Sequence, residues 1–153
     1  MNDLLFYAAV VLLAISVISC IVYNVVYWTN NLRLFESLLF DEKYPFEVPE
    51  DNYERFAKAA AIKDFCGRCW AKTAFRNKTE GEKKLDNLIT GNGLFGGLAL
   101  FLYFVPAVWG VFAGFILAVL LQYVYRNIIF AVGHIVAWRK ARRIYWQYQK
   151  GEL

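Results

Sequence analysis

Two long stretches of the chain carry no charged residue, and this feature constrains the fold more than any other. The first runs from Leu4 to Thr29 and the second from Leu94 to Tyr125. Both are long enough to cross the hydrocarbon core of a bilayer, since about 20 apolar residues suffice as a helix. Apolar residues make up 59% of the sequence, against about 45–50% in typical soluble proteins. The pattern therefore predicts an all-α integral membrane protein.

The first charge-free stretch predicts an N-terminal transmembrane helix over residues 1–29. Asn30 and Asn31 are expected to end it. Residues 30–90 are then expected to form a helical segment on the inner, cytosolic face. An acidic linker at residues 41–51 interrupts this segment, because its two prolines disfavour helix.

Within residues 30–90, two helices are expected after the linker. The first runs from about Glu50 to Phe75, where acidic residues beside Pro49 suit a helix start. The second begins at Thr79, which has capping-box spacing to Glu82, and reaches Ile89. Glycines in the run 91–93 are expected to break this helix before the next apolar stretch.

The second charge-free stretch is too long for one ordinary crossing, and Pro106 lies near its middle. A proline removes a helical hydrogen bond and disfavours helix in the residue before it. Two interpretations compete, a kinked single pass and a hairpin over residues 91–126. The hairpin would have its tip near Ala107 to Gly110 and arms of about 16 residues. The distribution of basic residues favours the hairpin.

Basic residues favour the inner side of a membrane. None precedes the first stretch, whereas residues 30–90 hold eleven Lys and Arg and the tail holds six. A hairpin, full or re-entrant, places both basic regions inside and the N-terminus outside. Residues 127–153 are expected to form a basic amphipathic helix on the membrane surface, and no nucleic-acid-binding module accompanies the charge. The residues expected to contact lipid headgroups are Arg126, Arg139, Lys140, Arg142 and Arg143.

Small and polar residues at three- and four-residue spacing share one face of the first helix. Lipid offers polar groups no partner, so this face is expected to contact protein. The alternative is that each hydroxyl bonds its own backbone four residues back. The residues of this face are Ala9, Ser16, Ser19, Cys20, Tyr23 and Asn24.

A second set of small residues recurs at every fourth position around the hairpin. Such spacing lets helix backbones approach closely, within one chain or toward a partner. Glycines near the hairpin tip can instead serve turns. The set comprises Gly93, Gly97, Gly110, Gly114 and Ala118.

Cys66 and Cys69 form the sharpest motif, because a CxxC spacing places both thiols on one helix face. Nearby basic residues are expected to favour thiolate. Three interpretations stay open: two half-buried structural thiols, a redox pair, and a zinc site completed by a second chain. A zinc site needs four ligands, and His134 lies far away in the sequence. His134 is instead expected to pack or hydrogen-bond.

The sequence therefore predicts a multi-pass membrane protein without catalytic activity or a cofactor of its own. Its partners are expected to be the bilayer and other membrane subunits, or further copies of this chain. The hypothesis is an accessory, assembly or regulatory subunit. Two rivals stay open. One is a holin-like oligomer that permeabilises membranes, and the other is a membrane thiol protein that uses Cys66 and Cys69.

Overall fold

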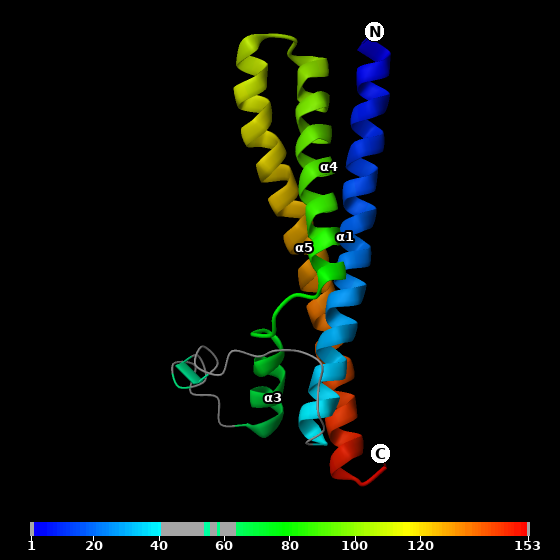
Figure 1. Ribbon diagram of the computed structural model, residues 1–153, viewed down its shortest axis with the longest axis vertical. Helices are drawn as coiled ribbons and strands as arrows, with labels where there is room; N and C mark the ends of the chain where they lie inside the picture. Colours follow the sequence, from blue (N-terminus) through cyan, green and yellow to red (C-terminus); the bar gives the residue numbers. More distant parts are fainter. Residues whose placement is uncertain (1, 41–53, 56–57, 59–63, 153) are drawn as a thin grey trace. The chain divides into compact units, whose positions relative to one another are not determined.

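The computed structural model describes residues 2–40, 54–55, 58 and 64–152, and these residues form helices and turns without a β-strand. They divide into two units, which are described separately. Figure 1 shows the course of the chain. The helices are α1 (Asn2–Leu39), α3 (Phe65–Thr73), α4 (Glu80–Phe104) and α5 (Val108–Gln149).

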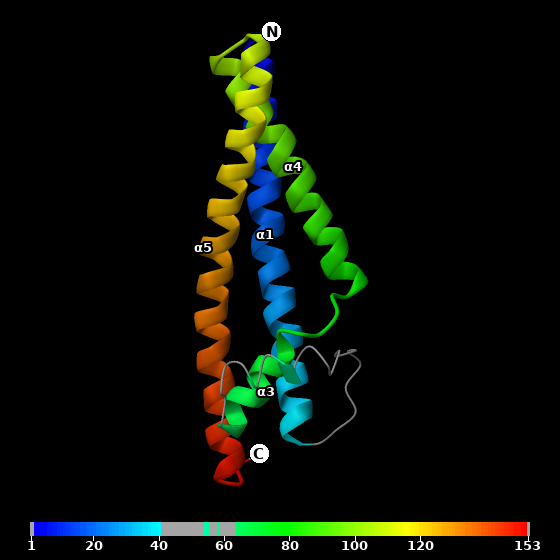
Figure 2. The same cartoon turned by 90° about the vertical axis from the view of Figure 1, so that its left-hand side faces the viewer.

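Unit 1 consists of residues 1–25 and 80–132. It contains the first part of α1, all of α4 and the first part of α5. Helices α4 and α5 run antiparallel and α1 lies beside them, as Figures 1 and 2 show. The expected cap at Thr79 agrees with the start of α4 at Glu80.

The chain reverses direction at Pro106, between α4 and α5. The Val105 amide still donates to the Phe101 carbonyl (2.9 Å), and the Ala107 amide closes a tight turn onto the Val105 carbonyl (2.8 Å). The reversal therefore falls just before the expected tip at Ala107 to Gly110. The arms are also longer than expected, since α4 has 25 residues and α5 has 42.

The expected helix break at residues 91–93 is wrong, because α4 passes through them without interruption. Glycine in a helix costs roughly 1 kcal/mol relative to alanine. Close packing offsets this cost at Gly93, which is buried. A Cβ there would lie 2.5 Å from Gln122 Nε2 and 2.8 Å from Ser16 Oγ. The glycine is needed for contact rather than for a turn.

Unit 2 consists of residues 26–79 and 133–153. The expected end of the first helix at Asn30 and Asn31 is wrong, since α1 continues to Leu39. Asn31 is buried and its Oδ1 accepts a hydrogen bond from Arg76 Nε. This contact between distant residues overrides the weak helix propensity of asparagine. Of the helix expected over 50–75, the described part contains α3, which ends at Thr73; the linker 41–51 lies outside the described residues.

The basic tail is not a separate helix, because α5 continues through residues 127–149. Part of its apolar face contacts protein within unit 2. Ala141 is fully buried in a small core with Phe35 and Cys66, and Trp138 and Ile144 pack against this core. The basic residues Arg139, Lys140, Arg142 and Arg143 are all exposed.

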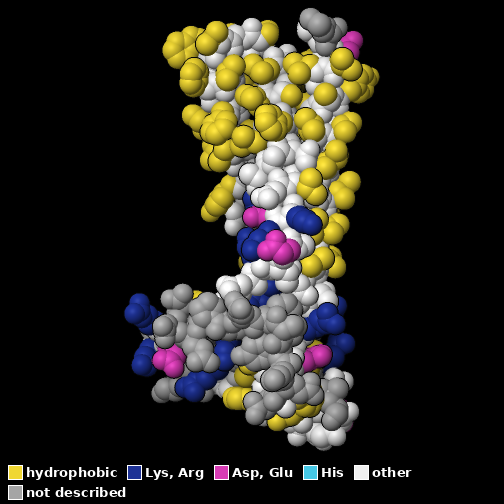
Figure 3. Space-filling view, in the orientation of Figure 1, with side chains coloured by type: hydrophobic (Ala, Val, Ile, Leu, Met, Phe, Trp, Pro, Cys, Tyr) yellow, Lys and Arg dark blue, Asp and Glu magenta, His cyan; other side chains and the backbone are white. Residues whose placement is uncertain are grey.

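Helices α1, α4 and α5 are each long and apolar enough to cross a membrane. Large hydrophobic side chains on them face outward, among them Leu4 (71% exposed) and Trp109 (81% exposed). On the face in Figure 3, hydrophobic side chains cover the part of unit 1 beside the α4–α5 connection. Exposed apolar surface of this extent is rarely found on monomeric soluble proteins.

Candidate functional site

The polar face of α1 packs inside unit 1. Ser16 Oγ donates to the Ile89 carbonyl of α4 at 2.7 Å and lies 2.6 Å from Tyr125 Oη of α5. This hydroxyl therefore bonds the other two helices, whereas the alternative interpretation required a bond to its own backbone. All six members of the face are buried, namely Ala9, Ser16, Ser19, Cys20, Tyr23 and Asn24.

The small residues of α4 and α5 allow these two helices to meet. A Cβ on Gly97 would lie 2.6 Å from the Ala118 Cβ. A Cβ on Gly114 would lie 3.0 Å from a ring carbon of Phe101. Gly110 lies in the first turn of α5, where its amide donates to the Ala107 carbonyl at 2.8 Å. A Cβ there would clash with the Val105 carbonyl oxygen.

Two further contacts between helices were not predicted from the sequence. Gln122 of α5 donates through Nε2 to the Ile89 carbonyl at 2.7 Å. Arg126 forms an ion pair with Asp86 of α4, and it is therefore engaged with protein rather than with headgroups alone. The sequence assigned Asp86 to the polar segment. Its place 40 residues before Arg126 gave no periodic signal.

Removing the Asp86–Arg126 ion pair is expected to destabilise unit 1 modestly. Both side chains are about one-third exposed (29% and 33%), which limits the loss for Asp86→Asn to about 1 kcal/mol. Reversing both charges should restore most of it. Unfolding in mixed micelles, followed by circular dichroism, measures the change. Glu80→Gln is the matched control, because the Glu80–Lys83 pair is exposed, and an equal loss there would contradict the assignment.

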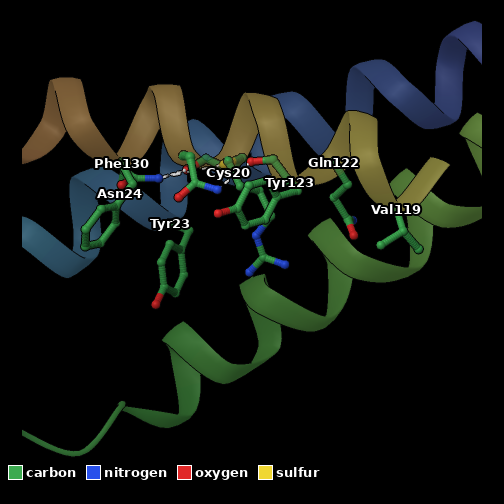
Figure 4. Close-up of a pocket in the computed structure, with 9 residues that line it drawn as sticks. Cys20, Tyr23, Asn24, Val119, Gln122, Tyr123 and Phe130 are labelled. Carbon is green, nitrogen blue, oxygen red and sulfur yellow. Dashed lines mark hydrogen bonds between the residues drawn. The ribbon is translucent and has the colours of Figure 1, made fainter. Parts of the chain in front are cut away.

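A groove of about 380 Å³ lies between α1 and α5 in unit 1. It is lined mainly by polar residues although both helices are apolar, and Figure 4 shows side chains of both helices around it. Val119 and Phe130 supply apolar walls. The polar residues that line it are Tyr23, Asn24, Gln122, Tyr123, Arg126 and Asn127.

Asn24 gives this groove an unsatisfied acceptor. The residue is 5% exposed, and its Nδ2 donates to the Cys20 carbonyl at 2.9 Å. Its Oδ1 is buried and accepts no hydrogen bond from the described residues. Leaving a buried polar atom unbonded costs on the order of 1–3 kcal/mol. A ligand that donated a hydrogen bond to this oxygen would recover part of this cost.

In unit 2, aromatic rings hold α3 against segments of α1 and α5. The Trp28 and Trp70 rings are stacked at 5.9 Å, and Trp138 lies 5.6 Å from Trp70. His134 Nε2 accepts a hydrogen bond from Trp70 Nε1 at 3.4 Å. As expected from the sequence, His134 packs and hydrogen-bonds.

Cys66 and Cys69 are both buried, on the face of α3 that packs into the core of unit 2. Asp64 caps this helix by accepting from the Gly67 amide at 3.1 Å. Burial raises the pKa of the Cys66 thiol, and Asp64 adds to the effect. Burial and then Cys66 raise the pKa of Cys69 from its ordinary 9.0 to about 11. The expectation of favoured thiolates is therefore wrong, because desolvation outweighs the nearby basic residues.

Both thiols are free. Within the described residues, no three His, Cys, Asp or Glu side chains are grouped so that they could hold a metal ion. Cys66 and Cys69 belong to the buried core of unit 2, and the groove between α1 and α5 is the candidate binding site in unit 1. Comparison with protein-family models, with curated proteins and with solved structures finds no match to this chain.

Proposed function

We propose that the chain is a multi-pass integral membrane protein that serves as an accessory or assembly subunit. Insertion is supported by three apolar helices and by their outward-facing hydrophobic side chains. In this arrangement α4 and α5 form a transmembrane hairpin. The N-terminus lies outside, and unit 2 lies on the inner side with the excess of basic residues.

Topology can be measured directly with a membrane-impermeant maleimide. The native cysteines are buried, so the wild type provides a low background. Cysteines introduced at Asn2 and Ala107 are expected to be labelled from outside, and one at Glu152 only after permeabilisation. Labelling of Ala107→Cys and Glu152→Cys from the same side would contradict the hairpin.

The outer face of α4 supports a role in assembly. The polar face of α1 and the small residues of the hairpin already make contacts within the chain. Contact with another subunit therefore needs another surface. A groove of about 550 Å³ runs along the exposed side of α4, lined by Asn87, Gly91 and Asn92 among others. A Cβ on Gly91 would meet no atom within 4 Å. Small and polar residues on one face of a membrane helix favour close contact with a second helix.

Gly91→Leu is expected to leave the chain folded but to abolish its association with other membrane helices. The added side chain points into the groove on α4, where its Cβ meets no atom within 4 Å. The measurement is native purification in a mild detergent, with mass and composition of the complex determined by mass spectrometry. Ala131→Leu is the control, because Ala131 is an exposed small residue of α5.

A wild-type protein that is strictly monomeric, with no subunit retained, would refute the accessory role. An unchanged complex in Gly91→Leu would instead keep the role and exclude this face of α4. The two results are therefore distinguishable.

A further inference from the structure

We propose that the groove between α1 and α5 binds the hydroxyl-bearing headgroup of a membrane lipid. The proposal rests on the bilayer placement given above, but it does not depend on the accessory role. Three features of the groove support it: its depth in the bilayer, its hydrogen-bonding groups and its charge.

The Asp86–Arg126 ion pair gives the depth of the groove. Asp86 is as far in sequence from the end of α4 at Phe104 as Arg126 is from the start of α5 at Val108. At the helical rise of about 1.5 Å per residue, both separations span about 27 Å. The hydrocarbon core of a bilayer is about 30 Å thick. With the hairpin tip at the outer boundary, the groove therefore lies at the inner headgroup level.

Three amide side chains present their oxygen atoms as acceptors. In each one the NH₂ group donates to a backbone carbonyl: Asn24 to Cys20 at 2.9 Å, Asn127 to Tyr123 at 2.7 Å and Gln122 to Ile89 at 2.7 Å. A carbonyl accepts but cannot donate, so these bonds fix which end of each amide carries the nitrogen. The remaining group of each amide is its oxygen. A fitting ligand must therefore supply several hydrogen-bond donors.

The charge of the groove disfavours an anion as the main determinant. Arg126 is the cation of the groove, and its guanidinium already bonds Asp86 and, through Nη1, Thr90 Oγ1 at 3.4 Å. An added phosphate would compete with the Asp86 carboxylate. Hydroxyl groups meet the three acceptors without this conflict, and a sugar, glycerol or inositol headgroup carries several of them.

An apolar path for acyl chains leads from the groove along α5. Val119 lines the groove, and Ile116 and Phe112 precede it by three and seven residues, so all three share one helix face. These side chains are 41%, 59% and 66% exposed. A lipid seated by its headgroup would therefore lay its chains along this face toward the bilayer centre.

The full chain purified in lauryldimethylamine oxide tests the proposal, since this detergent brings no hydroxyl group. Three lipids with identical acyl chains are titrated and the retained lipid is counted by native mass spectrometry: a monogalactosyl diacylglycerol, a phosphatidylglycerol and a phosphatidylcholine. We expect the galactolipid to bind at least about tenfold more tightly than phosphatidylcholine. The affinity for phosphatidylglycerol, which carries two hydroxyls, should equal one of these two affinities or lie between them.

Asn24→Leu and Asn127→Leu each remove one acceptor and are expected to weaken galactolipid binding about tenfold, the equivalent of one hydrogen bond. Ser37→Ala is the control. Its hydroxyl also donates to a carbonyl four residues back, that of Arg33 at 2.9 Å, but it lies in unit 2 and does not line the groove. Asn127 is exposed, so its variant keeps the test valid if Asn24→Leu misfolds.

Equal affinity for galactolipid and phosphatidylcholine would overturn the proposal. So would binding of phosphatidylglycerol without galactolipid, because charge would then be the recognised feature. A photo-crosslinking residue in place of Tyr123 that captured protein instead of lipid in native membranes would also overturn it. The lipid titrations do not bear on the maleimide topology or on subunit retention, so their failure leaves the proposed function separately testable.

Discussion

Gly97→Leu is expected to lower the free energy of unfolding of unit 1 by about 2–3 kcal/mol, the cost of overpacking a close contact. A Cβ at this position would lie 2.6 Å from the Ala118 Cβ and 3.0 Å from the Ala118 Cα. Because one of these atoms belongs to the backbone, rotation of a side chain cannot relieve the clash. The hairpin helices must move apart. Unfolding in mixed micelles measures the loss.

Gly91→Leu on the same helix is the control for Gly97→Leu. Both variants exchange glycine for leucine in α4, and both gain the same helix propensity, roughly 1 kcal/mol. A Cβ at Gly91 would meet no atom within 4 Å. The free energy of unfolding of Gly91→Leu should therefore equal or exceed that of the wild type. Similar stability of the two variants would show that α4 and α5 do not meet at Gly97 and Ala118.

Cys69 is expected to resist alkylation by iodoacetamide far more strongly than an unfolded thiol. The thiolate is the reacting form. A pKa of about 11 in place of 9.0 lowers the thiolate fraction below pH 9 about 100-fold. Labelling should accelerate as the pH rises from 9 toward 11. Mass spectrometry of peptides from the labelled protein separates Cys69 from Cys66 and Cys20.

The same pKa predicts how the stability of unit 2 depends on pH. The folded state holds the Cys69 proton more tightly than the unfolded state. Its contribution is therefore complete below about pH 9 and is lost as the pH rises through 11. The denatured protein is the reference for alkylation and should react fully at pH 8. Rapid labelling of native Cys69 at pH 7.5 would contradict the buried site and revive the redox hypothesis.

The long helices were predictable because they depend on features that act locally. Absence of charge marks a helix that lipid or protein must cover, and Pro106 marks a break whatever surrounds it. The capping spacing at Thr79 likewise depends on one turn of chain. These signals located the start of α4 and the α4–α5 connection to within a few residues.

The helix boundaries at Asn31 and Gly93 were missed for the opposite reason. Asparagine and glycine are weak helix formers, and local propensity alone would end a helix at either. The structure continues through both because a distant residue contacts them, Arg76 at Asn31 and Gln122 at Gly93. A single sequence does not show which distant residue will contact these positions in the folded protein.

The candidate site was predictable in part. Spacing on α1 identified Asn24 and its neighbours as one face, since helical periodicity is local. The other wall of the groove, with Gln122 and Asn127, depends on how α5 is rotated about its axis, which spacing does not give. The state of Cys69 depends on burial, so a count of nearby basic residues misjudged the sign of its pKa shift.

The Ile89 carbonyl, which accepts from both Ser16 and Gln122, has a consequence for biosynthesis. Ser16 is made 73 residues before Ile89. Until α4 has been made, this hydroxyl can bond only its own helix, at the carbonyl four residues back. The contact between Ser16 and Ile89 can therefore form only after the chain has been translated through α4, so the three helices assemble late in synthesis.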